Sequence, residues 1–179
     1  MLPIDGALLR GIERLSTPPL RAAMVTLYRL TGKGTMPLLV LTTLAVLARQ
    51  RRWTDLVLVA GACGGVYVWV DLLLKPLVNR ARPVDPLLML DSSSFPSGHT
   101  AGAVAFSLSL ALVLMRSWPR QRQLLLLLSG IWSTVVGFST LVVRAHWPSD
   151  VIGGAAVGLV WLELCLAVWR QGLHRTRHR

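Results

Sequence analysis

Long apolar runs separated by short arginine clusters fill the sequence from about residue 34 onward. A membrane-spanning helix needs about 20 apolar residues. Charged residues make up only 15% of the 179, against about 25% in soluble domains. The pattern therefore predicts an all-α integral membrane protein, a bundle of about five transmembrane helices, and excludes a soluble globule or a disordered chain. The expected spans are about Met36 to Ala48, beginning near Gly34, then Trp53 to Val78, His99 to Met115, Leu124 to Val143, and Ser149 to Trp169.

The first 33 residues differ from the rest. Apolar residues at helical spacing between residues 4 and 15 predict an amphipathic helix that lies in the membrane interface, with Asp5 as its cap. Pro18 and Pro19 predict the first turn of a second helix. The predicted organisation is an interfacial region over 1–33, a helix bundle over 34–170, and a basic cytoplasmic tail over 171–179.

The net charge of +11 is concentrated in short segments between apolar runs, which is typical of cytoplasmic membrane loops and not of nucleic-acid binding. With five spans, the basic loops at 49–52 and 116–122 and the tail fall on one side of the membrane. The positive-inside rule places that side in the cytoplasm. We therefore expect a bacterial-type plasma membrane protein that binds lipid and has no nucleic-acid partner.

Three polar clusters fall together on the other side by the parity of the spans: Lys75 to Pro83, Phe95 to Thr100, and Arg144 to Asp150. They bring cationic side chains, two histidines, an aspartate and a helix start to one interface. This combination of groups suits a tetrahedral oxyanion, because free amides at a helix N-terminus bind phosphate. The sequence therefore predicts a phosphate site on the extracytoplasmic side.

Most of these residues also have a purely structural interpretation. Arg80 can be an interface anchor with its charge at the membrane surface, and Lys75 can pair with Asp71 one helical turn earlier. Ser97 can be an ordinary helix cap, and Asp150 can stabilise a helix start. In the functional interpretation, Asp150 orients His146 four residues before it and makes its imidazole more basic. Glu163 lies mid-span and is not assigned a role; it can face Lys75 or line the bundle interior.

The spacing of these clusters resembles the three-part signature of the type-2 phosphatidic acid phosphatase family. The matching residues are Lys75 followed by Arg82-Pro83, then Pro96-Ser97-Gly98-His99, then His146 with Asp150. The family includes lipid phosphate phosphatases, undecaprenyl diphosphate phosphatases and vanadium haloperoxidases.

The resemblance implies roles for these positions. His146 would be the nucleophile that forms a phosphohistidine, held by Asp150, and His99 would protonate the leaving group. Lys75, Arg82, Ser97 and the amide of Gly98 would bind the phosphoryl oxygens. The resemblance implies no metal and no other cofactor.

One position departs from the family. The third motif usually begins Ser-Arg, and here Ser139 is followed by Thr140. Arg144 lies one helical turn further along, and we expect it to bind the phosphate instead; the alternative is an interface anchor. The predicted function is metal-independent hydrolysis of a lipid phosphate or isoprenoid diphosphate, such as undecaprenyl diphosphate, phosphatidylglycerophosphate or phosphatidic acid. The alternative is a lipid-phosphate binding or transport protein that is weakened in catalysis by Thr140.

Overall fold

A computed structural model describes residues 3–32 and 34–177, so residues 1, 2 and 33 of the predicted interfacial region and 178–179 of the predicted tail lie outside it. All the elements of the described residues are helical. They are α1 Pro3–Leu15, α2 Pro18–Leu30, α3 Thr35–Arg49, α4 Trp53–Tyr67, a π-helical segment Val68–Leu74, α5 Lys75–Val78, α6 Gly98–Ser117, a 3₁₀ turn Pro119–Gln121, α7 Arg122–Val142 and α8 Pro148–Arg177.

Four helical stretches are long and apolar enough to cross a membrane: Trp53–Val78, Gly98–Ser117, Pro119–Val142 and Pro148–Gln171. A helix rises 1.5 Å per residue. The 15 residues of α3 are therefore too short to cross the ~30 Å hydrocarbon core alone. The helices α2 and α3 meet at a 49° bend and pass the same criteria only when they are counted together as one broken span. The predicted all-α membrane bundle is confirmed, with four spans or five.

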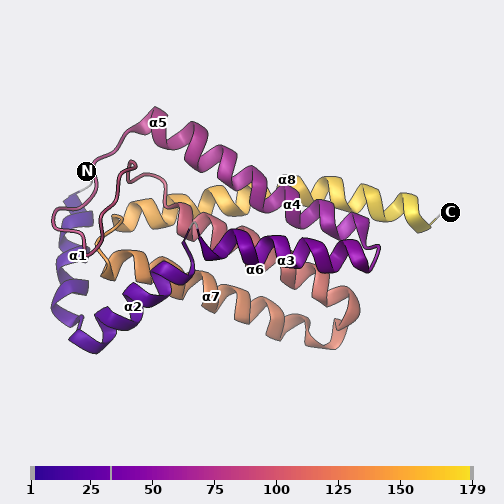
Figure 1. Ribbon diagram of the computed structural model, residues 1–179, viewed down its shortest axis with the longest axis horizontal. Helices are drawn as coiled ribbons and strands as arrows, with labels where there is room; N and C mark the ends of the chain where they lie inside the picture. Colours follow the sequence, from indigo (N-terminus) through magenta and orange to yellow (C-terminus); the bar gives the residue numbers. More distant parts are fainter. Residues whose placement is uncertain (1–2, 33, 178–179) are drawn as a thin grey trace.

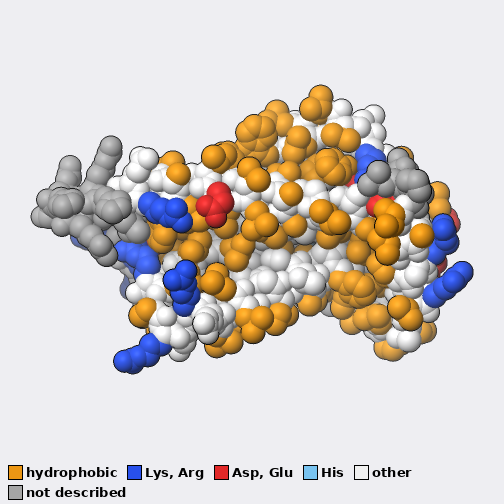
Figure 2. Space-filling view, turned by 180° about the vertical axis from the view of Figure 1, so that it is seen from behind, with side chains coloured by type: hydrophobic (Ala, Val, Ile, Leu, Met, Phe, Trp, Pro, Cys, Tyr) orange, Lys and Arg blue, Asp and Glu red, His pale blue; other side chains and the backbone are white. Residues whose placement is uncertain are grey.

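The helices form an elongated bundle in which α6 packs against α4, α7 and α8 (Figure 1). Small side chains on α6, such as the fully buried Ala101 and Ala105, let its neighbours come close. At Gly158 of α8, a Cβ atom would lie only 2.9 Å from the carbonyl oxygen of Ala101. Figure 2 shows apolar side chains over the middle of the molecule and Lys and Arg side chains toward its two ends, as a membrane protein requires.

The N-terminal helices pack on one end of the bundle, α1 against α7 and α8 and α2 against α7. Ile4, Leu8 and Leu15 of α1 are exposed, at 61%, 49% and 79%, while Asp5 is buried. These three apolar side chains of α1 therefore face away from the protein, while Leu9 is buried. The carboxylate of Asp5 accepts a hydrogen bond from the Ser149 amide at the start of α8, 3.0 Å away.

Two features of α8 bear on the sequence analysis. Of the two orientations left open for Glu163, neither is present, because its side chain is exposed on the outside of α8. The helix continues to Arg177, so residues 171–177 of the predicted tail are helical.

Candidate active site

The predicted site residues meet at the end of the bundle that α1 covers (Figure 1). They come from the segment that follows α4, the long loop 79–97, the start of α6, and the turn between α7 and α8. Each lies at a helix end or in a loop, because a membrane bundle has water and free backbone groups only there.

His146 is 1% exposed, and the position of its ring is set by a backbone carbonyl. Its Nδ1 lies 2.7 Å from the carbonyl oxygen of Ser94, which can only accept a hydrogen bond. Nδ1 therefore carries the proton, and in the neutral ring the lone pair is on Nε2. Asp150 lies 3.8 Å from the same Nδ1, near enough for electrostatic attraction but beyond hydrogen-bond distance.

The electrostatics of this end keep His146 neutral. Burial lowers the pKa of His146 below its ordinary value, and the positive charge of Arg82 lowers it further. The carboxylate of Asp150 and the carbonyl of Ser94 oppose this shift without reversing it. His146 therefore has the protonation state that a nitrogen nucleophile needs at neutral pH.

Asp150 is fully buried and its carboxylate is held from several directions. One oxygen accepts hydrogen bonds from the Ser94 hydroxyl and, at 2.8 Å, from the backbone amide of Trp147. The other oxygen forms an ion pair with Arg80. Asp150 thus fixes Ser94, whose carbonyl fixes His146, so part of its control over the ring is indirect.

Arg80 joins Asp150 to the N-terminal helix. Its second nitrogen, Nη2, lies 2.7 Å from the Asp5 carboxylate, and Nη1 also donates to the Ser149 hydroxyl at 2.7 Å. Asp5 in turn accepts hydrogen bonds from the hydroxyl and the amide of Ser149. Burial alone raises the pKa of Asp5, but these hydrogen bonds and Arg80 outweigh it and hold the pKa below its ordinary value. Arg80 is therefore part of a buried ionic network and not a simple interface anchor.

Lys75 and the start of α6 lie side by side. The predicted ion pair of Lys75 with Asp71 is present at 2.6 Å. A Cβ atom placed on Gly98 would lie 3.4 Å from Nζ of Lys75, so this ammonium group sits against the first residue of α6. Ser97 caps α6 by accepting a hydrogen bond from the Thr100 amide at 3.4 Å. The Asp71 carboxylate lies 3.6 Å from the same Cβ position, so the helix start faces the Lys75–Asp71 ion pair and not a free ammonium group.

Arg82 holds the loops around the site by their carbonyl groups. Nη1 lies 2.5 Å from the carbonyl oxygen of Ala145, next to His146, and Nε lies 2.6 Å from that of Ser92. Among the described residues, no carboxylate forms an ion pair with it. Its direct partners are therefore carbonyl groups and the hydroxyl of Ser92, to which Nη2 donates at 3.0 Å.

His99 is fixed by α2. Its Nε2 lies 3.1 Å from the carbonyl oxygen of Tyr28, and the two rings stack with their centroids 4.0 Å apart. The carbonyl can only accept, so Nε2 carries a proton and Nδ1 is the nitrogen that is left to exchange one.

Arg144 has an unusual environment. It ends α7 in the left-handed conformation with φ 58°, which is uncommon for a residue other than glycine. Its Nη1 pairs with Glu13 of α1 at 2.9 Å, while its Nε is buried with no hydrogen-bond partner. Such an unsatisfied donor costs about 1–3 kcal/mol, and active sites are a common place for one. Thr140, by contrast, is fully buried and its hydroxyl bonds to Gly137 of its own helix at 2.7 Å.

The sequence did not identify the contributions of Asp5, Glu13, Tyr28 and Ser94. Three of these are on the N-terminal helices, which were predicted only as an interfacial region. The sequence does contain one signal that α1 contacts the protein. Asp5 and Glu13 lie on the same helix face as Leu9, so that face carries two acidic groups beside an apolar residue.

Comparisons with known proteins bear on the family and the fold of the chain. Residues 52–173 match the family model described as PAP2 superfamily. Phosphatidylglycerophosphatase B of Bacillus subtilis is 26% identical over 161 residues, which are 87% of this chain and 78% of that protein. The protein of the same name from Escherichia coli is 38% identical over 76 residues, 42% of this chain but only 28% of that protein. The crystal structure of the transmembrane PAP2 type phosphatidylglycerolphosphate phosphatase from Bacillus subtilis has the same fold, with a TM-score of 0.85 at 24% identity, covering 94% of this chain and 85% of that one.

The network through Arg80 yields a prediction of stability. Replacing Asp5 with alanine leaves Arg80 short of one buried partner and removes the cap of α8. We expect Asp5→Ala to lower the free energy of unfolding by about 3 kcal/mol. The measurement is thermal unfolding of the purified protein in detergent, with Asp91→Ala, in the exposed part of the loop, as the matched control. Equal unfolding midpoints for the two variants would contradict a role for α1 in holding the site.

Proposed function

The chain belongs to the PAP2 superfamily, and from that membership and the geometry of its site we propose that it hydrolyses the phosphate ester or diphosphate of a membrane lipid. The observation that carries the proposal is the environment of His146. Its Nδ1 is fixed by Ser94, its ring is kept neutral, and the cations Lys75, Arg82 and Arg144 lie at the same end of the bundle. A fixed neutral imidazole at an end of the bundle that also carries lysine and arginine side chains is suited to nucleophilic attack on phosphorus.

The proposed reaction has two steps. Lys75, Arg82, Ser97, Arg144 and the amide of Gly98 bind the phosphoryl oxygens, and Nε2 of His146 attacks phosphorus. The bond from phosphorus to the leaving oxygen breaks, and His99 gives that oxygen a proton, which yields the lipid alcohol or lipid monophosphate. Water then attacks the phosphohistidine, His99 accepts its proton, and phosphate leaves with His146 restored.

Cationic side chains neutralise the phosphate in this scheme, so the proposed reaction needs no metal ion. The proposed substrates are an isoprenoid diphosphate, such as undecaprenyl diphosphate, and a phospholipid monoester, such as phosphatidylglycerophosphate or phosphatidic acid. The names of the relatives favour the phospholipid monoester. Because the site lies at the ends of the helices, the head group of the lipid would bind at the membrane interface while its hydrocarbon chain stays in the bilayer.

The second candidate function is lipid-phosphate binding without turnover. It is favoured by Thr140, whose closed and buried side chain cannot reach a phosphate as the usual arginine would. It differs from the first in one measurable property, the release of inorganic phosphate.

The direct test is a phosphate-release assay with purified protein in detergent, with EDTA present. We expect release from phosphatidylglycerophosphate, phosphatidic acid or undecaprenyl diphosphate, and its loss to background in His146→Ala, because no other group replaces the nucleophile. Unfolding midpoints of parent and variant establish that both are folded. Turnover near the parent level in His146→Ala would overturn the nucleophile assignment, and no release from any of the lipids by the folded parent would favour the binding protein.

Arg144 gives a second prediction. An arginine–phosphate contact is charge-assisted and often bidentate, so Arg144→Ala should lower kcat/KM by on the order of a hundredfold. Arg144→Lys should restore only part, because a point charge does not replace a planar fork.

Two further variants separate phosphate binding from the ion pair with α1. Glu13→Gln removes the partner of Arg144 and should leave kcat/KM within about threefold of the parent, since the guanidinium remains. Arg10→Ala, an exposed arginine of the same helix, is the control for charge at the interface. If Glu13→Gln loses as much activity as Arg144→Ala, the role of Arg144 is to hold α1.

We also propose that the site faces the extracytoplasmic side, in a bacterial-type plasma membrane, because the arginine-rich loops at 49–52 and 116–122 are at the opposite end. In a protein with Cys63 and Cys165 replaced by alanine, a membrane-impermeant thiol reagent should label Met89→Cys in intact cells. Met89 is 95% exposed in the loop at the site end. Gln121→Cys should be labelled only after the membrane is opened, and the reverse pattern would place the site in the cytoplasm.

A further inference from the structure

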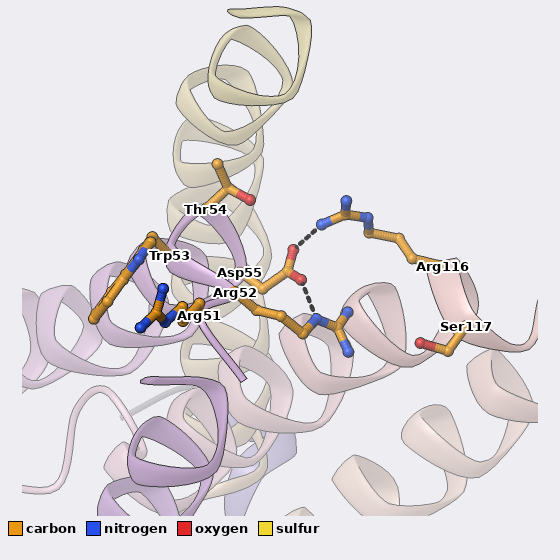
Figure 3. A pocket seen from close by; sticks show the side chains of 7 residues that line it. All are labelled: Arg51, Arg52, Trp53, Thr54, Asp55, Arg116 and Ser117. Atoms are coloured by element: carbon orange, nitrogen blue, oxygen red, sulfur yellow. Dashed lines mark hydrogen bonds and ion pairs between the residues drawn. The ribbon is translucent and has the colours of Figure 1, made fainter. Parts of the chain in front are cut away.

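A basic cavity lies at the end of the bundle opposite the candidate active site. It has a volume of about 500 Å³ and lies between the loop after α3, the start of α4 and the end of α6. Its lining, drawn in Figure 3, is Arg51, Arg52, Trp53, Thr54, Asp55, Arg116 and Ser117. None of these residues belongs to the site described above, so the proposed phosphatase activity does not account for the cavity.

The charges of this cavity do not balance. Asp55 is the one acidic residue in its lining, and it is fully buried and already saturated. Arg52 binds one of its oxygens at 2.7 Å and Arg116 binds the other at 2.5 Å (Figure 3). The indole nitrogen of Trp169 donates to that second oxygen at 3.0 Å. Three arginines against one carboxylate leave two positive charges. The remaining N–H groups of Arg116, which is 42% exposed, and the exposed Arg51 are where an anion would bind.

A second hollow, of about 220 Å³, adjoins the basic cavity and shares Trp53 and Thr54 with it. The rest of its lining is Val57, Val168 and Trp169, so it is almost wholly apolar. Val57 and Val168 are 56% and 61% exposed and lie within two of the membrane-spanning stretches, on α4 and α8. This second hollow therefore begins at the arginines and extends along the lipid-facing surface of the bundle.

We propose that the two hollows together are a binding site for one anionic phospholipid of the surrounding membrane. The phosphate lies between Arg51 and Arg116, with the hydroxyls of Thr54 and Ser117 beside it. The first part of an acyl chain lies against Trp53, Val57 and Val168. Charge complementarity selects the phosphate, since basic pockets between transmembrane helices bind lipid head groups, and the adjoining apolar hollow selects a lipid over a free anion.

Two arginines of this site are held in place by other residues, unlike a surface arginine that only extends to the lipid head groups. Asp55 fixes Arg52 and Arg116 in place, and Arg52 is held further by the carbonyl of Val113 at 3.0 Å. Of the two arginines proposed to bind the phosphate, Arg116 is therefore already held in place and loses little side-chain freedom on binding, which favours affinity. A lipid in this position touches the α3–α4 loop, α4, α6 and α8, so its binding stabilises the packing of all four.

The test uses phosphatidylglycerol, a phosphodiester that a phosphomonoesterase does not consume. Native mass spectrometry of the detergent-purified protein gives the number of bound lipids and the dissociation constant. We expect one tight phosphatidylglycerol per chain, and an unfolding midpoint that rises with its concentration. Phosphatidylcholine with the same acyl chains, and inorganic phosphate alone, should bind at least about tenfold more weakly.

Two variants locate the site. Arg51→Gln should weaken phosphatidylglycerol binding about tenfold, by removing one charge-assisted contact. Val57→Trp should weaken it by filling the apolar hollow. The matched controls are Arg120→Gln, an exposed arginine at the same end, and Leu128→Trp, an exposed position on α7; both should bind as the parent does.

Phosphatase activity in every variant should equal that of the parent when no phosphatidylglycerol is added, because the active site is at the other end of the bundle. Equal binding of phosphatidylglycerol and phosphatidylcholine, or parent-like binding by both Arg51→Gln and Val57→Trp, would overturn the proposal. Equal binding of inorganic phosphate and phosphatidylglycerol would also overturn it, because the apolar hollow would then have no occupant. A lipid site that survives these tests stands whether or not the proposed catalysis does, since none of the readouts depends on turnover.

Discussion

The buried ion pairs of Arg80 are the interaction on which the rest of the site depends. Arg80 lies between Asp5 of α1 and Asp150 of α8, which are 1% and 0% exposed. Burying either carboxylate is costly unless a positive charge pairs with it. Arg80 supplies that charge to both, so the positions of Asp5 and Asp150 depend on each other. Asp150 then fixes Ser94, and Ser94 fixes the ring of His146. The position of the imidazole thus depends on a helix that is not among the four long spans.

Packing within the bundle makes this ionic network possible. Gly154 and Gly158 of α8 allow it to approach the backbone of α6, so that the amide of Ser97 reaches the carbonyl of Asp150 at 3.0 Å. That contact joins the N-terminus of α6, which carries Gly98 and His99, to the first turn of α8, which carries Asp150. A backbone hydrogen bond therefore joins the motif that contains Gly98 and His99 to the motif that contains Asp150. The loops determine only where the individual side chains lie.

Sequence reasoning found the spans and the end of the bundle where the chemistry gathers, because hydrophobic runs and the parity of spans are local properties. The roles proposed for His99 and His146 came from the family resemblance. The contact between Asp5 and Ser149 could not be found in this way, since it joins residues 144 positions apart and depends on how α1 docks. The carbonyl of Ser94 could not be found either, because the direction of a backbone group in an irregular loop has no signature in the sequence. The role of Asp5 at α8 was missed for a related reason: an acidic residue in a first turn suits its own helix start as well as that of a neighbour.

The pairing of charges suggests how this site can accept a phosphate that arrives with its own negative charge. Lys75 is paired with Asp71, Arg80 with two buried carboxylates, and Arg144 with Glu13. Glu13 is 41% exposed, against 19% for Asp71, so its carboxylate is the least costly of these to return to water. Arg82 is held by carbonyl groups, and no buried carboxylate has to leave it. Arg82 and Arg144 are therefore the two guanidinium groups that can turn to a phosphate without unpairing a buried acid, and the unsatisfied Nε of Arg144 already favours that exchange.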